Sequence, residues 1–127
     1  MTTQQATATQ QVADRFNELA QQGRFDVVLD ELYAEDAISR EPIGNKFLPD
    51  AEGLAAIRKK GEDFNNGIQE VHNGWCSAPV VGDAFFCVSM GMEVTMKGDT
   101  ERTIMDELCV YEVKDGKIVK EEFFYTV

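Results

Sequence analysis

Two carboxylates are candidates for acid–base chemistry. Glu41 directly precedes Pro42, and Asp106 lies in an apolar stretch with Ile104 and Leu108. A residue before proline is held in extended geometry, which gives the Glu41 side chain a defined direction. Burial raises the pKa of a carboxyl group toward neutrality, where it can give and take protons. We therefore predict Glu41 and Asp106 as the catalytic pair of an internal pocket.

Both carboxylates also have a structural interpretation. Glu41 could pair with a nearby arginine or lysine, and Asp106 could accept a hydrogen bond from Trp75, His72 or Arg102. A lone buried carboxylate is costly, so a partner is expected in either case. The sequence leaves both interpretations open.

His72 is the only histidine, and imidazole is the side chain whose unperturbed pKa lies nearest to 7. It is a candidate acid or base if it points inward. Alternation puts Trp75 on the pocket side, where its indole N–H could orient a ligand oxygen, although a β-bulge would reverse that assignment. One histidine and three scattered cysteines do not make a metal-ligand set. We expect no metal and no cofactor.

Three amphipathic helices must position these groups. Apolar residues at spacings of three and four indicate helices over about residues 7–22 and 25–32. A third is expected to begin near Asp50, its N-cap, and to end at Asn66-Gly67. Residues 1–9 are rich in Thr, Gln and Ala, and we expect a flexible lead-in there.

The hydrophobic period changes to two after Gly67, which predicts strands at about 68–78, 83–97, 101–113 and 117–126. Asp115-Gly116 between the last two is a strong hairpin signal. Strands joined by hairpins form an antiparallel sheet. The predicted fold is α+β: a cone-shaped barrel with three N-terminal helices packed in the concave face of a strongly curved antiparallel sheet.

Strand alternation then assigns side chains to the two faces of that sheet. The predicted pocket lining, beside the catalytic pair, is Phe16, His72, Trp75, Val88, Met90, Met92, Leu108, Glu121, Phe123 and Tyr125. Methionines make an adaptable apolar wall, so we expect a small, mostly apolar ligand, unless these side chains simply fill the cone. The convex face is assigned Cys87, Ser89, Met105, Cys109, Tyr111 and Phe124, and we predict a homodimer through it.

The composition excludes some partners. There are 23 acidic and 12 basic residues, a formal net charge of −11. Nucleic acids and anionic membranes both attract basic surfaces, so we expect neither as a partner. The three cysteines form no CxxC pair and fit a reduced, cytoplasmic chain. The length of 127 residues predicts one domain, residues 1–127.

Three segments carry a family resemblance: Leu32-Tyr33-Ala34-Glu35-Asp36-Ala37, the helix opening Glu52-Gly53-Leu54-Ala55-Ala56-Ile57, and the closing Lys114-Asp115-Gly116-Lys117-Ile118-Val119. In this order the chain resembles the nuclear transport factor 2-like superfamily, in its SnoaL-like branch, over about residues 10–126. The resemblance implies the cone-shaped barrel, often dimeric through its sheet. The fold hosts isomerases, dehydratases, cyclases and non-catalytic binders, so it does not settle function.

The resemblance to ketosteroid isomerase places Glu41 at the position of that enzyme's general base. Its two oxyanion donors fall at Phe16 and Leu108, which cannot donate, so we do not expect steroid isomerase chemistry. The resemblance to SnoaL-branch cyclases places Asp106 at their inward aspartate, with Met92 where they have a histidine. We predict a pocket protein with acid–base isomerase, cyclase or dehydratase activity, or alternatively a non-catalytic ligand-binding or dimerisation module.

Overall fold

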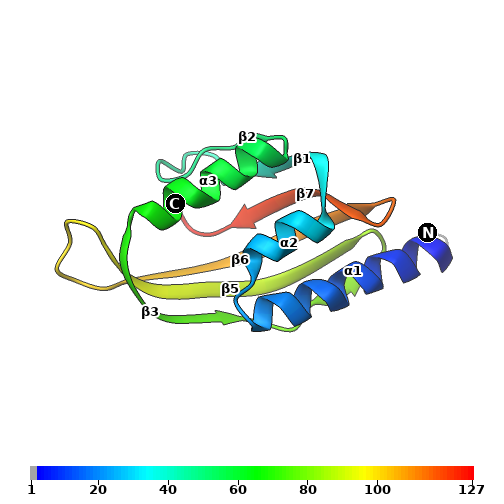
Figure 1. Cartoon of the computed structure of the whole chain (residues 1–127), viewed down its shortest axis with the longest axis horizontal. Helices are drawn as coiled ribbons and strands as arrows, with labels where there is room; N and C mark the ends of the chain where they lie inside the picture. The colour runs from blue at the N-terminus through cyan, green and yellow to red at the C-terminus, as the bar shows by residue number, and fades with distance from the viewer. Residues whose placement is uncertain (1–2) are drawn as a thin grey trace.

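Figure 1 shows a computed structural model that describes residues 3–127, with three helices over one face of a curved sheet. The helices are α1 (Thr3–Gln21), α2 (Phe25–Leu32) and α3 (Leu54–Asn66). The strands are β1 (Tyr33–Arg40), β2 (Ala51–Glu52), β3 (Ile68–Cys76), β4 (Val80–Gly82), β5 (Phe85–Met96), β6 (Thr103–Lys114) and β7 (Lys117–Phe124). The predicted α+β class is confirmed.

Helix α1 packs its apolar stripe on the sheet. Val12, Phe16 and Leu19 lie three or four residues apart, and all three are buried. The helix begins at Thr3, so the flexible lead-in predicted over residues 1–9 is wrong for residues 3–9, and residues 1–2 lie outside the described residues. Polar residues of this segment are packed against the sheet, which their composition did not indicate. Thr9 is fully buried, and Gln5 Nε2 donates to the carbonyl of Val113 at 3.1 Å.

The sheet order is β2-β1-β7-β6-β5-β3, with β4 also paired to β5. The pairs are antiparallel except β1 with β7, which is parallel. The sheet is therefore mixed rather than purely antiparallel. Hairpins fix the direction of neighbouring strands, whereas β1 and β7 lie at opposite ends of the sequence and have no such constraint. The parallel pair places Ser39 beside Glu121.

The predicted hairpin between β6 and β7 is confirmed. Asp115 and Gly116 have φ angles of 52° and 75°, the left-handed conformation that a two-residue turn of this kind requires. A β-bulge follows in β7, where the partners shift from Val113–Ile118 to Glu112–Lys120. The bulge lets both Ile118 and Glu121 turn toward the interior.

The orientation of β6 is opposite to the predicted one. Met90 pairs with Glu107 and Gly91 with Asp106, and residues directly opposite each other share a face. Since the even residues of β5 face inward, as predicted, the odd residues of β6 do too. Met105, Cys109 and Tyr111 therefore lie inside and not on the convex face, whereas Asp106 and Leu108 are exposed. Both parities of β6 carry apolar residues, so alternation alone could not decide between them.

An aromatic cluster forms the centre of the core. The Phe16 ring lies 5.3 Å from Phe86 and 4.9 Å from Tyr111, measured between centroids, and Phe86 and Tyr111 stack at 4.9 Å. Such contacts add to the stability gained by burying the rings. The cluster joins α1 to β5 and β6 and forms one end of the cavity described below. No helix within residues 3–127 is long and apolar enough to cross a membrane.

Candidate functional site

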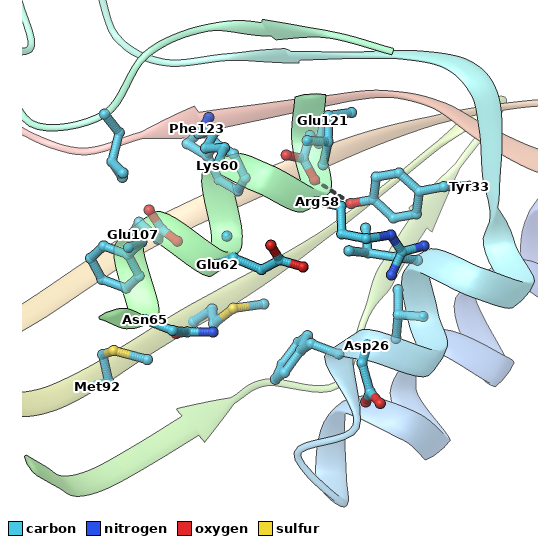
Figure 2. Close-up of a pocket in the computed structure, with 18 of the residues that line it drawn as sticks. Asp26, Tyr33, Arg58, Lys60, Glu62, Asn65, Met92, Glu107, Glu121 and Phe123 are labelled. Atoms are coloured by element: carbon cyan, nitrogen blue, oxygen red, sulfur yellow. Dashed lines mark hydrogen bonds between the residues drawn. The ribbon is translucent and has the colours of Figure 1, made fainter. Parts of the chain in front are cut away.

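A cavity of about 390 Å³ lies between the helices and the concave face of the sheet. This volume is in the usual range for small-molecule sites. Its wall is mostly apolar and includes Phe16, Phe64, Met90, Met92 and Phe123. Figure 2 shows polar side chains entering it from several elements, among them Lys60 from α3, Glu107 from β6 and Glu121 from β7.

Glu41 follows the end of β1 and is held by three hydrogen bonds. Its backbone N–H donates to Asp50 Oδ1 at 2.8 Å, so Asp50 holds this segment and does not cap α3, whose N-cap is Gly53. Its carboxylate accepts hydrogen bonds from Lys60 Nζ at 2.5 Å and from the Tyr125 hydroxyl at 2.7 Å. The Glu41 side chain is only 2% exposed, which makes this a buried ion pair.

Lys60 links Glu41 to the interior of the sheet. Its Nζ also donates to Ser39 Oγ at 2.9 Å and lies 5.1 Å from the centre of the Phe123 ring. The Lys60 side chain is 8% exposed. The aromatic face and the carboxylate both stabilise the ammonium charge.

Glu121 is a second buried carboxylate of the cavity. It accepts hydrogen bonds from the hydroxyls of Tyr33 and, at 2.6 Å, Ser39. Burial raises the pKa of Glu121, while these hydroxyls and the Lys60 ammonium act against that rise. A continuous hydrogen-bonded chain therefore runs from Tyr33 through Glu121, Ser39, Lys60 and Glu41 to Tyr125.

Glu107 stands apart from this chain. Burial, followed by repulsion from Glu41 and Glu121, raises the pKa of Glu107 to about 7, while Cys109 and Lys60 act to lower it. Its hydrogen-bond partner is the Cys109 thiol, with Sγ to Oε1 at 3.7 Å, a weak donor. A carboxyl group with a pKa near 7 can exchange protons at neutral pH, which is what general acid–base catalysis requires.

The structure brings several predicted residues together in the cavity lining. These are Glu41, Phe16, Met90, Met92, Glu121 and Phe123. Tyr125 lies beyond β7 and reaches the site through its hydrogen bond to Glu41. Val88 is buried in the core and does not line the cavity.

Asp106 and Leu108 do not reach the cavity. The inward orientation predicted for them is wrong, because the register of β5 and β6 turns their side chains to the convex face. Leu108 is 44% exposed there. The adjacent residue, Glu107, takes the inward position that was assigned to Asp106.

His72 and Trp75 are also outside the cavity lining, and β-bulges in β3 are the reason. The register with β5 shifts between Ile68 and Glu70 and again between Val71 and Asn73. His72 bonds Thr95 Oγ1 at 2.7 Å and lies 3.2 Å from Glu70.

Trp75 instead pairs with Gly91 on the convex face, where its indole lies against the glycine backbone. A Cβ at Gly91 would overlap Cζ2 of this indole and would lie 2.5 Å from the carbonyl oxygen of Met105. Only glycine fits this close approach.

Sequence reasoning missed Tyr33, Ser39, Lys60 and Glu107. Lys60 stands next to Lys59 in an amphipathic helix, away from the apolar stripe, and a lysine there is typical of a solvated position. Glu107 carried a usable signal: pairing with the apolar even face of β5 would have turned it inward, had the register been known. Within residues 3–127, no group of His, Cys, Asp or Glu side chains is arranged to hold a metal ion.

Comparison with known proteins agrees with this architecture. The model of the SnoaL-like domain family matches residues 7–125. No match was found among curated proteins. A candidate SnoaL-like polyketide cyclase from Mesorhizobium loti is 33% identical over 91% of this chain and 97% of its own, with a TM-score of 0.83.

Two more distant structures share the fold. An NTF2-like protein of unknown function from Burkholderia pseudomallei is 16% identical, with a TM-score of 0.72 over 94% of this chain and 91% of its own. TerC, co-crystallised with polyporic acid, is 15% identical, with a TM-score of 0.70 over 94% of this chain and 92% of its own. The chain belongs to the SnoaL-like domain family.

Proposed function

We propose that this protein binds a small, mostly apolar carbonyl compound and moves a proton on it by acid–base chemistry, with Glu107 as the proton-transferring group. The observation that carries the proposal is a mostly buried carboxyl group on the wall of an apolar cavity, with a weak thiol donor as its hydrogen-bond partner. Burial there raises the pKa of Glu107 to about 7. Such a group takes a proton from a carbon next to a carbonyl and returns it elsewhere. Isomerisation, cyclisation and dehydration all use this step.

The other cavity carboxylates support Glu107 in this role. Both oxygens of Glu41 and both of Glu121 accept hydrogen bonds from side chains, whereas Glu107, among residues 3–127, accepts one only from a thiol. Their negative charges also contribute to the raised pKa of Glu107. Proton transfer by Glu41 itself stays a prediction, and it would require release of its ion pair with Lys60.

The named relatives fit this class of substrate. The Mesorhizobium loti protein is named as a candidate polyketide cyclase, and TerC was co-crystallised with polyporic acid. Closing a carbocyclic ring by aldol chemistry begins with the removal of a proton next to a carbonyl. Glu107 has the pKa for that step.

Hydrogen–deuterium exchange tests the proposal without knowledge of the natural substrate. A panel of small cyclic ketones in D₂O is incubated with the protein, and loss of the α-proton signal is followed by ¹H NMR. We expect accelerated exchange with the wild-type protein and with Asp106→Asn, a neighbouring carboxylate on the opposite face, and loss of the acceleration with Glu107→Gln. Equal acceleration by wild type and Glu107→Gln contradicts the proposal.

A second candidate is a non-catalytic ligand-binding protein. It is favoured by the complete hydrogen bonding of Glu41 and Glu121, which is typical of a structural polar network. Native mass spectrometry of the purified protein distinguishes the two: a stoichiometric, unchanged small molecule favours binding alone. A ketone that gains deuterium in the exchange assay favours catalysis.

We also propose a homodimer through the convex face of the sheet. The exposed apolar residues there are Trp75, Leu108 and Phe124, which are 38%, 44% and 47% exposed, and Cys87 and Ser89 lie on the same face. Large apolar side chains exposed on one face of a sheet favour a partner surface that covers them. A monomer by light scattering at micromolar concentration contradicts this proposal.

A further inference from the structure

Proton removal by Glu107 moves a negative charge onto the ligand. The C–H bond next to the carbonyl breaks, the proton joins Glu107, and the electron pair moves to the carbonyl oxygen. The total charge in the cavity is unchanged, but the new oxyanion needs a strong donor in a wall that is mostly apolar. This hydrogen-bond donor has to come from a side chain that reaches the cavity.

Most donors around the cavity already have an acceptor. The hydroxyls of Tyr33 and Ser39 donate to Glu121, and that of Tyr125 donates to Glu41. The Tyr111 hydroxyl interacts with the Cys109 thiol. A hydroxyl has one proton to give, so none of these is free for a ligand without breaking an existing bond.

Lys60 has a donor to spare. An ammonium group has three N–H bonds, and the described residues offer hydrogen-bond acceptors for two, Ser39 Oγ and Glu41 Oε2. Its side chain is 8% exposed and lines the cavity. The other cation in the lining, Arg58, pairs with Asp30 in a far more exposed position.

We propose that Lys60 binds the carbonyl oxygen of the ligand through its remaining N–H and stabilises the negative charge that forms there when Glu107 takes the proton. This rests on the proposed function. Glu41 and Ser39 hold the ammonium group in place before the ligand arrives, so little reorganisation is needed in the reaction.

The proposal narrows the ligand class. The carbonyl oxygen lies at Lys60, the acidic C–H at Glu107, and the apolar body among Phe16, Met90 and Phe123. An enolisable cyclic ketone satisfies all three. A phenolate is a stable mimic of its enolate, since both carry a negative oxygen on a planar unsaturated carbon.

4-Nitrophenol serves as the probe, because its absorbance reports its ionisation. It is bound to Glu107→Gln, in which the amide imitates protonated Glu107, and titrated with pH. Among the described residues, eight ionisable groups besides Lys60 line the cavity: Asp26, Tyr33, Glu41, Arg58, Glu62, Glu107, Tyr111 and Glu121. We expect the pKa of the bound phenol to lie at least about one unit below its free value, as an adjacent cation causes.

Substitutions of two lysines test whether Lys60 causes the lowered pKa of the bound phenol. In the Glu107→Gln background, Lys60→Gln should abolish the lowering of the phenol pKa, and Lys60→Arg should preserve it. Lys59→Gln, on the exposed side of the same helix, should leave the phenol pKa unchanged. If Lys60→Gln does not fold, ¹⁵N NMR of the wild-type lysines replaces it: the Lys60 Nζ signal must move when nitrophenol binds and that of Lys59 must not.

Two results overturn the role of Lys60: a lowered phenol pKa that survives Lys60→Gln, or no nitrophenol binding at all. Neither readout requires turnover, so the exchange assay above judges Glu107 separately. A Lys60-dependent shift with exchange that is unaffected by Glu107→Gln would leave Lys60 as an anion-binding group and refute only the proton transfer.

Discussion

Glu107 should make the folded protein less stable at neutral pH than in acid, and Glu107→Gln should remove that penalty. The pKa of Glu107 is raised by folding, so the unfolded chain loses this proton first as pH rises. Between the unfolded and folded pKa values the unfolded state binds fewer protons, and the free energy of unfolding falls. Below both values there is no difference, and above both the loss is complete.

The size of the effect follows from the two pKa values. The pKa rises from 4.5 to about 7 on folding. At 1.36 kcal/mol per unit, this corresponds to a loss of about 3 kcal/mol between roughly pH 4 and pH 8. That is a large share of the stability of an ordinary domain. A glutamine fills the same space without a charge, so Glu107→Gln should be more stable than wild type by about this amount at pH 8, with the advantage vanishing near pH 4.

Urea unfolding at half-unit steps from pH 4 to pH 8 measures this difference. Subtracting the wild-type curve from that of Glu107→Gln cancels the titration of the carboxylates that do not interact with Glu107; Glu41 and Glu121 are coupled to it and contribute to the difference. Asp106→Asn is the control: it removes an adjacent but exposed carboxylate and should not reproduce the pH-dependent gain. Parallel curves for wild type and Glu107→Gln would refute the placement of this carboxyl in a dry cavity.

Three further predictions concern the fold that holds the cavity. Gly91→Ala should lower the free energy of unfolding by about 2 kcal/mol in urea titrations, because the new methyl overlaps an indole and a backbone carbonyl, whereas Gly82→Ala, with open space around it, should change it by less than about 0.5 kcal/mol. Phe16→Ala should cost about 3–5 kcal/mol by the same measurement, against near zero for the exposed Phe47→Ala, and equal costs would contradict the described core. Leu108→Glu should halve the mass seen by light scattering if the convex face forms a dimer, and an unchanged dimer would place the interface elsewhere.

The sequence predicted the elements better than it predicted the orientation of two strands. The apolar even residues of β5 and the Asp-Gly hairpin each had a single interpretation, and both were right. Strand β6 has apolar residues on both parities, so its orientation depended on its register with β5. That register is set by the loop over residues 97–102, for which the sequence offers no simple rule.

The hydrogen-bonded network of Ser39, Glu121 and Lys60 could not be predicted from the sequence for a different reason. Ser39 and Glu121 lie side by side only because β1 and β7 pair in parallel, a long-range contact with no local sequence signal. Lys60 reaches the same place from α3, although its neighbour Lys59 is fully typical of a solvated position. In β3, bulges reversed the orientation expected for Trp75.

A ¹³C NMR titration of the side-chain carboxyl groups measures the proton exchange of Glu107 directly. The resonance of this group is identified as the one that disappears in Glu107→Gln. We predict that it titrates with a midpoint near 7, as a buried carboxyl next to Glu41 and Glu121 should. A midpoint near the ordinary value of 4.5 would show that Glu107 is fully ionised at neutral pH and is not the acid–base group of this cavity.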